Sequence, residues 1–234
     1  MKVIKLTRSN LDKVADALEE GKIVCFPTDT IYGLLVKAND SSAIERLYSI
    51  RRPSNRPFLM LIDGTYWLKD LGVIYRPIHE RLMNIFNATF IFYKKNTFPL
   101  YLTRGRKSLA VRIPPFDSHV YELLEYLKAP VVAPSANPEG QKPATTIKEA
   151  MDYFGNSVDL YVDGGVRKGK PSTIVRALYP KGLRLVREGN IPFKKILQAY
   201  RELRATFSAL PEDALLESSS LDPFDPDLPF PPLR

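Results

Sequence analysis

The chain has 234 residues, of which 44% are hydrophobic and 11% aromatic, so it can bury the core of a globular domain. No apolar run approaches the roughly 18 residues that a membrane span needs, and a single cysteine excludes an intrachain disulfide framework. Residues 1–204 carry 33 basic and 20 acidic side chains, net +13, within a chain of net charge +8. This charge favours nucleotides, nucleic acid or other polyanions as partners; a surface that is basic only for solubility is the alternative.

The N-terminal region predicts a helix followed by a buried strand. Ser9-Asn10 precedes apolar residues at helical spacing, and Gly21 follows the last of them. The strand 22–26 runs into Pro27, which places the polar turn PTDT at a strand end, where ligands often bind. The first residues lack the continuous apolar stretch of a secretory signal, so we expect a cytoplasmic protein.

Strand and helix patterns alternate through the rest of residues 1–204, which predicts one α/β domain. Further helices are expected at 41–50, with Asp40-Ser41 as the cap, and at 76–86, 118–127, 146–154 and 192–204. Further strands are expected at 58–62, 89–93, 108–113, 130–134, 160–162, 172–177 and 183–186. Residues 205–234 are acidic and proline-rich, so we expect a flexible tail; the alternative is an extended strap across the basic body, anchored by Phe224 and Phe230.

Common catalytic and metal-binding patterns are missing from the sequence. His79 and His119 lack the close ligand spacing of a zinc site, and neither stands near a serine elbow. Cys25 lies in an apolar run and is expected to be a buried, inert thiol. Asp29, inside PTDT, is expected to cap local backbone amides or to take part in chemistry.

The segment DGGVRKGKPST imitates a phosphate-binding P-loop but departs from it at one position. Pro171 separates Lys170 from Ser172, and the residues that follow favour a strand instead of a helix. We therefore interpret it as a glycine-rich basic turn that delivers Ser172 and Thr173 to a strand.

Six motifs together are distinctive: PTDTIYGL, the basic loop 51–56, SLAVRIP, APSANPEG, PSTIV and RLVREG. In order and spacing they make the chain resemble the YrdC/TsaC family of L-threonylcarbamoyladenylate synthases, in its short, single-domain form, over nearly all of residues 5–200. The resemblance implies a single YrdC-like α/β (α+β) domain, with a twisted mixed β-sheet flanked by helices and a basic concave face.

The resemblance also implies a reaction. L-threonine, bicarbonate and ATP, the last with Mg²⁺, would yield threonylcarbamoyl-AMP and pyrophosphate for threonylcarbamoyladenosine at tRNA position 37. A separate transferase complex would receive the product, and tRNA or other RNA is a possible direct contact. Such a site needs mainly to hold the threonine carbamate in line with the α-phosphate and to neutralise charge, so no side chain is assigned as catalytic.

The family pattern, carried over residue by residue, implies two groups of binding residues. Thr30, Arg112 and Ser172 would bind threonine. ATP would be bound by Arg52, Arg56, Ser108, Ala133 through its backbone, Ser135, Asn137 and Arg187. Tyr32 would wall the pocket, and Arg51 is a further candidate because the lysine usual in the basic loop is absent here. The usual Pro-Gly-Pro is also replaced, by Phe86-Asn87-Ala88 and its neighbours, which should reshape one wall.

Two other functions are alternatives. An RNA-binding module without turnover would suit the net charge of residues 1–204, although no RRM-type aromatic motif is visible. Carbamoyl transfer of the hydrogenase-maturation kind uses a related domain, but within a much longer chain that carries zinc-finger and acylphosphatase parts.

Overall fold

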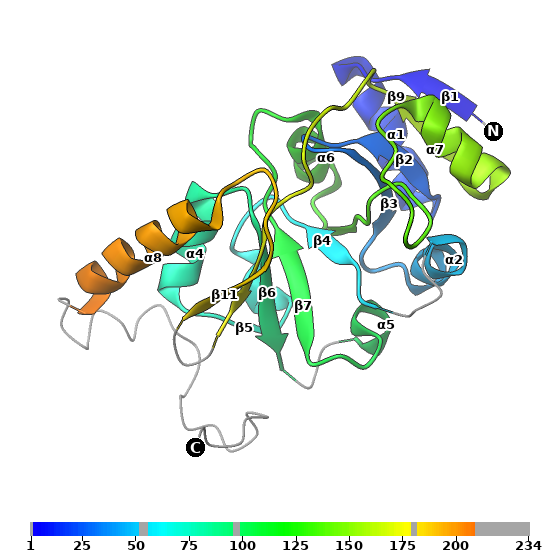
Figure 1. Ribbon diagram of the computed structural model, residues 1–234. Helices are drawn as coiled ribbons and strands as arrows, with labels where there is room; N and C mark the ends of the chain where they lie inside the picture. The colour runs from blue at the N-terminus through cyan, green and yellow to red at the C-terminus, as the bar shows by residue number, and fades with distance from the viewer. Residues whose placement is uncertain (1, 52–55, 96–98, 179–181, 209–234) are drawn as a thin grey trace.

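The computed structural model describes residues 2–51, 56–95, 99–178 and 182–208, and within them one mixed β-sheet forms the centre of the fold (Figure 1). Its strands are β1 (Lys2–Lys5), β2 (Val24–Pro27), β3 (Tyr32–Lys37), β4 (Leu59–Leu61), β5 (Val73–Ile74), β6 (Thr89–Lys94), β7 (Ser108–Arg112), β8 (Val131–Val132), β9 (Leu160–Asp163), β10 (Ile174–Ala177) and β11 (Leu183–Arg187).

The strand order joins segments that are far apart in sequence. It runs β1-β9-β2-β3-β8-β4-β7-β6-β10-β11, with β5 beside β6. The first strand pairs in parallel with β9, so Lys2 lies opposite Leu160. At the other end β10 runs parallel to β6, placing Ile174 opposite Thr89. The mixed pairing confirms the predicted fold class.

Helices cover both faces of this sheet. They are α1 (Leu11–Glu19), α2 (Ser41–Arg51), α3 (Trp67–Asp70), α4 (Pro77–Ile85), α5 (Leu100–Thr103), α6 (His119–Leu127), α7 (Ile147–Phe154) and α8 (Phe193–Ser208), with 3-10 turns at Arg8–Asn10 and Gly155–Ser157. The helices α1 and α6 share one apolar cluster with strands β2, β8 and β9. A larger cluster joins the sheet to α2, α4, α7 and α8, and α4 lies against α8.

Side-chain caps mark the starts of the helices α2, α6 and α7. Asp40 accepts from the backbone N of Ala43, Ser118 from that of Tyr121, and Thr146 from that of Glu149. The start of α1 differs: neither Ser9 nor Asn10 caps it through a side chain, because a 3-10 turn precedes the helix there.

Five elements were not predicted: β1, β3, β5, α3 and α5. The strand β1 lies at the sheet edge and has a lysine at each end, as edge strands often do, so it lacks the apolar pattern of a buried strand. The strand β3 is buried on both faces, so its sequence is a continuous apolar run without alternation. The last helix continues to Ser208, past the predicted domain end at Arg204. Residues 209–234 of the predicted tail lie outside the described residues.

Candidate active site

A cavity of about 730 Å³ opens over the strands at the centre of the sheet. Its floor is made by alternate residues of four strands: Leu59, Leu61, Thr89, Ile91, Tyr93, Ser108, Ala110, Arg112, Ile174 and Arg176. The residues between them point the other way, into the core: Met60, Phe90, Phe92, Leu109, Val111 and Val175. Because strand side chains alternate between faces, one sheet supplies both the cavity floor, which mixes apolar and polar side chains, and the apolar core.

The loop between β2 and β3 forms one wall of the cavity and is held rigidly. The Oγ1 of Thr28 donates to the carbonyl of Ile31 over 2.6 Å and lies 3.1 Å from the Oγ1 of Thr30. Gly169 packs against this loop so closely that a Cβ there would clash with the carbonyl oxygen of Thr30. The predicted threonine ligand Thr30 therefore has a fixed backbone, and the residue lines the cavity.

Tyr32 ties the glycine-rich turn to the same wall. Its hydroxyl donates to the carbonyl of Gly165 over 2.8 Å and accepts from the backbone N of Gly164 over 3.0 Å. The residue lines the cavity and is fully buried, and burial raises the pKa of its hydroxyl. Tyr32 thus lines the cavity and also anchors residues 164–165. A strand, β10, follows this turn, as the rejection of a P-loop required.

Arg112 is the largest fully buried side chain of the described residues, and its donors are directed by two neighbours. Its Nη1 and Nη2 donate to Oδ1 and Oδ2 of Asp29 over 2.9 and 2.6 Å. Its Nε donates to the carbonyl of Asn87 over 2.9 Å. The expectation that Asp29 caps local amides is wrong, because both of its recorded hydrogen bonds in the described structure go to this guanidinium. Asn87, in the segment that replaces Pro-Gly-Pro, supplies the backbone carbonyl that accepts from Nε.

Two buried hydroxyl groups line the cavity together with Arg112. Thr89 lies opposite Arg112 in the β6–β7 pairing, and its Oγ1 is 2.8 Å from the Oγ of Ser172. Both hydroxyls are buried and both residues line the cavity. Ser172 was predicted from the sequence and Thr89 was not, because residues 89–93 (TFIFY) show no alternation of polar and apolar side chains. Arg187 donates to the carbonyl of Ser172 over 2.9 Å and lines the same cavity.

The loop 133–137 forms the opposite wall and is held by Arg51. The Nε of Arg51 donates to the carbonyl of Ser135 over 2.8 Å, and its Nη2 donates to Ser135 Oγ and to Asn137 Oδ1. Ala133 and Ser135 line the cavity, whereas Arg51 and Asn137 lie behind that wall in the described structure. Arg51 therefore supports this loop from the end of α2; its predicted ATP contact, like that of Asn137, stays a prediction.

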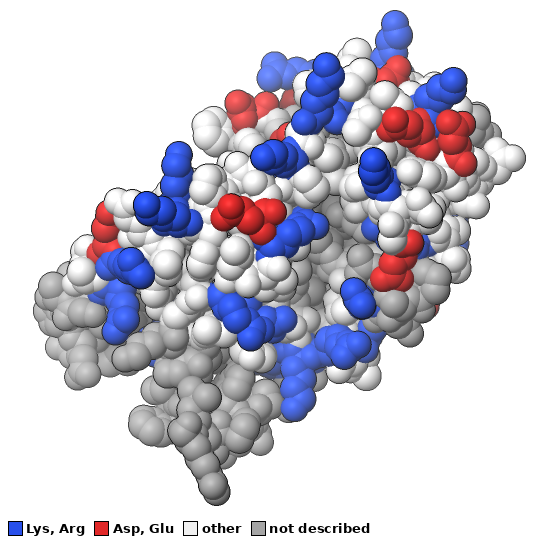
Figure 2. Space-filling model, viewed as in Figure 1, with Lys and Arg blue, Asp and Glu red and all other residues white. Residues whose placement is uncertain are grey.

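Basic side chains gather at the rim of the cavity, where Figure 2 shows lysine and arginine around the hollow. Arg56 and Ser108, two of the predicted ATP ligands, line it. Arg106, Lys107 and Arg176 line it as well and were not predicted. Arg52 lies outside the described residues. Of the predicted residues, the cavity lining includes Thr30, Tyr32, Arg56, Ser108, Arg112, Ala133, Ser135, Ser172 and Arg187.

The described residues contain no group of three His, Cys, Asp or Glu side chains suited to hold a metal ion. Cys25 is fully buried, as predicted, and burial raises the pKa of its thiol. His79 is also buried, in the first turn of α4. Within the described ranges, no helix is long and apolar enough to cross a bilayer.

The family model of the Sua5/YciO/YrdC domain, whose description reads telomere recombination, matches residues 16–189, which include every motif of the cavity. This chain belongs to the Sua5/YciO/YrdC family. A threonylcarbamoyl-AMP synthase of Pyrococcus abyssi is 31% identical over 81% of this chain and 57% of its own length. One of Vibrio vulnificus is 27% identical over 71% of this chain and 92% of its own length.

A solved structure of this family has the same fold. The crystal structure of P. abyssi Sua5 complexed with L-threonine superposes with a TM-score of 0.74 at 28% identity, covering 85% of this chain and 59% of that one. The chain therefore spans less than two thirds of the P. abyssi relatives and nearly all of the Vibrio relative.

Proposed function

We propose that this protein is an L-threonylcarbamoyladenylate synthase, a nucleotidyltransferase that converts L-threonine, bicarbonate and ATP to threonylcarbamoyl-AMP and pyrophosphate. One observation carries the proposal: a single cavity has a buried arginine among hydroxyls at one end and exposed arginines at its rim. The first set suits an amino acid and the second a polyphosphate. The relatives named threonylcarbamoyl-AMP synthase support the same reaction.

The threonine end would use Arg112, Thr30 and Ser172, as the family resemblance implies. A guanidinium donates to a carboxylate, and neighbouring hydroxyls complete its hydrogen bonds. The P. abyssi relative was crystallised with L-threonine, which supports a threonine site in this fold. We add Thr89 to this group because its buried hydroxyl is paired with that of Ser172.

The ATP end would use Arg56, Arg187 and Ser108 with the loop 133–135. Arginine forks bind phosphate oxygens bidentately, and the rim offers further positive charge at Arg106 and Lys107. Mg²⁺ would enter with the triphosphate, and the carboxylate of Asp29 would stay bound to Arg112. Bound Mg²⁺ neutralises phosphate charge.

The chemistry would need positioning more than a side-chain nucleophile. The threonine amine and bicarbonate give a carbamate with loss of water. A carbamate oxygen then bonds to the α-phosphorus of ATP as the bond to the β-phosphate oxygen breaks, and pyrophosphate leaves. In this proposal Arg112 holds the threonine carboxylate while the rim arginines neutralise the charge that builds on the phosphates.

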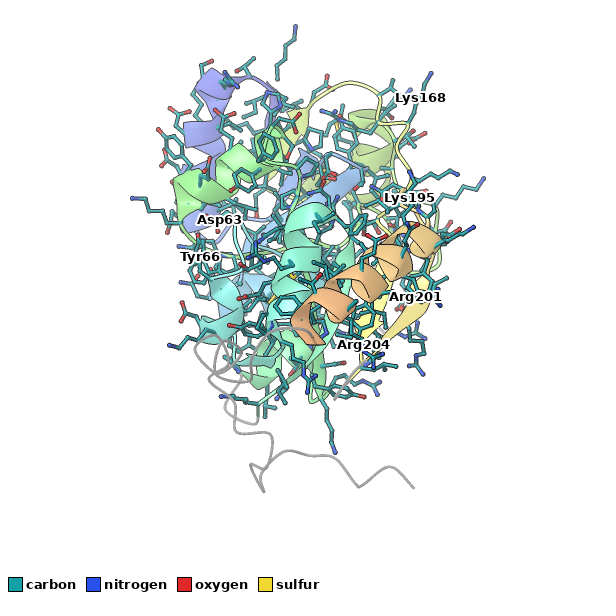
Figure 3. The ribbon with its side chains drawn as sticks, turned by 90° about the vertical axis from the view of Figure 1, so that its left-hand side faces the viewer. Asp63, Tyr66, Lys168, Lys195, Arg201 and Arg204 are labelled. Atoms are coloured by element: carbon teal, nitrogen blue, oxygen red, sulfur yellow. The ribbon has the colours of Figure 1, made fainter. Side chains whose placement is uncertain are left out.

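The product would serve threonylcarbamoyladenosine formation in tRNA, in the cytoplasm, through a separate transferase complex. A second candidate function, an RNA-binding module without turnover, is favoured only by the basic rim and by basic residues on α8. Figure 3 shows Lys195, Arg201 and Arg204 along α8, and Lys168 on the turn 164–171, higher in the same view. Direct tRNA contact on this face would weaken steeply with salt.

The test is a three-substrate assay with the full chain. Pyrophosphate release should require L-threonine, bicarbonate and ATP together, and mass spectrometry should detect threonylcarbamoyl-AMP. Arg112→Ala should raise the KM for threonine at least ~10-fold while the KM for ATP changes little, because only the threonine end loses a ligand. The control Arg201→Ala removes an exposed arginine of α8 and should leave both constants unchanged. RNA binding by folded protein that makes no product would favour the second candidate.

A further inference from the structure

The buried ion pair between Asp29 and Arg112 stands between two hollows of the protein. Arg112 lines the large cavity, whereas Asp29 lines a second hollow of about 270 Å³ on the other side, together with Asp117 and His119. The side chain of Arg112 is 2% exposed and that of Asp29 is 12% exposed. The Asp29 carboxylate therefore reaches the tip of the guanidinium from the second hollow and not from the cavity.

The contacts of Arg112 leave two of its N–H groups for a ligand. A guanidinium has five N–H groups, and three of them are used by Asn87 and Asp29. One N–H remains on each terminal nitrogen, and these two point to opposite flanks of the guanidinium because Asp29 takes the pair at its tip. A carboxylate arriving in the cavity therefore meets a guanidinium whose plane and direction are already set, and no rotamers of this long side chain must be frozen on binding.

The carboxylate itself is held by a rigid backbone. Asp29 lies within the loop Thr28–Ile31. The hydroxyl of Thr28 donates to the carbonyl of Ile31 across this loop, and Gly169 packs against the backbone of Thr30. Arg112 ends β7, and β8 and β4 separate that strand from β3 in the sheet. The pair thus joins two elements that backbone hydrogen bonds do not connect directly, and it fixes their spacing at the threonine end of the cavity.

We propose that Asp29 is a positioning residue for threonine recognition: by binding the tip of the guanidinium it fixes the direction of Arg112, so that an unused N–H group is held in place for the substrate carboxylate. The inference rests on the proposed function. It assigns Asp29 no contact with the substrate, and it predicts an effect on threonine affinity that a purely structural ion pair would not have.

The experiment compares Asp29→Ala with Asp117→Ala in the full chain. Asp117 lines the same second hollow, is exposed, and makes no recorded bond to Arg112 in the described structure, so it controls for loss of one negative charge. Asp29→Ala should raise the KM for threonine at least ~10-fold, with a much smaller change in the KM for ATP, and Asp117→Ala should change neither. Added formate, which can fill the vacated space at the tip of the Arg112 guanidinium, should lower the threonine KM of Asp29→Ala towards the wild-type value.

Several results would overturn the inference. Equal losses in both KM values, a lower threonine KM in Asp29→Ala, or no response to formate would each do so. If Asp29→Ala does not fold, Asp29→Asn keeps the volume but offers an amide N–H to one Nη, and it should show the same selective rise. Wild-type protein assayed in parallel separates the two questions, because absence of product there contradicts the proposed function, and calorimetric threonine binding by the folded variants still tests Asp29.

Discussion

Single residues at the threonine end are constrained by distance as much as by chemistry. Gly169 illustrates this, since its neighbour is a backbone carbonyl that cannot move aside as a flexible side chain would. The glycine is thus required for close approach between the turn 164–171 and the loop that carries Thr30. A single sequence does not show this requirement, because Gly169 also fits the P-loop-like pattern of the glycine-rich turn.

We therefore expect Gly169→Ala to push the two loops apart. Because a displacement of about 1 Å at a binding site can cost ~100-fold, the threonine KM should rise ~10- to 100-fold while the fold is retained. Steady-state kinetics and circular dichroism provide the measurement. Lys168→Ala, an exposed neighbour in the same turn, is the matched control and should behave as wild type. An unchanged threonine KM in Gly169→Ala would show that the loops can separate without consequence.

Much of the candidate site could be predicted from sequence at the residue scale, and the part that could not has a common cause. Polar residues at strand ends, such as Thr30, Arg112 and Ser172, indicate a ligand site by their position and by the family motifs to which they belong. The partnership of Asp29 with Arg112 depends on a contact between residues 83 positions apart, which no local pattern encodes. Thr89 was not predicted, because a threonine in a strand is ordinary by propensity.

At the scale of elements, the start of α4 contains a group that couples folding to pH. His79 is 4% exposed, its Nδ1 accepts from the backbone N of Arg76 over 3.0 Å, and its ring lies 5.6 Å from that of Phe92. Burial, with a smaller contribution from Arg76, lowers the pKa of His79 to about 4. The folded protein therefore keeps this imidazole neutral at pH values where an unfolded chain would protonate it.

The sign of the effect follows from this difference. Between about pH 6.5 and pH 4 the unfolded chain binds a proton that the folded chain does not, so the free energy of unfolding should fall with decreasing pH by about 3 kcal/mol in total. Urea titrations at pH 7.0, 5.5 and 4.5 measure it. His79→Asn removes the titrating group and should give a shallower dependence by up to one proton. Identical slopes in both proteins would contradict the prediction.

For elements, the sequence signals worked where periodicity and caps act locally. The helices α2, α6 and α7 begin at the predicted Asp40, Ser118 and Thr146, because a side-chain acceptor satisfies their first free N–H groups. Prediction failed where tertiary contacts decide. The strand β1 is largely exposed and exists through its pairing with β9, and the four-residue helices α3 and α5 are too short to show a helical period.

At the scale of the whole molecule, charge is divided unevenly between the domain and the C-terminal residues. Residues 209–234 contain six acidic residues and one arginine, so their removal changes the net charge from +8 to +13. A chain ending at Ser208 retains α8 entire and should keep threonine and ATP turnover within ~2-fold of wild type. It should bind RNA more tightly at low salt, because six negative charges are lost.

The measurement is turnover together with RNA retention between 50 and 200 mM salt, compared for both chains. A rise in turnover on truncation would contradict this expectation and would favour the strap that the composition offers as its alternative. A variant in which the same six carboxylates are replaced by amides is the control for charge without a change of length.

The wide separation of the cavity residues along the chain has a consequence for biosynthesis. The cavity is lined by Thr28, near the start of the chain, and by Arg187, near its end. The strand β1 likewise pairs with β9, which is synthesised much later. At a synthesis rate of roughly 5–20 residues per second, on the order of 10 to 30 s pass on the ribosome between the first wall and the last. A nascent chain stalled before β11 carries most of the domain and no complete binding site, so premature termination should yield an inert product.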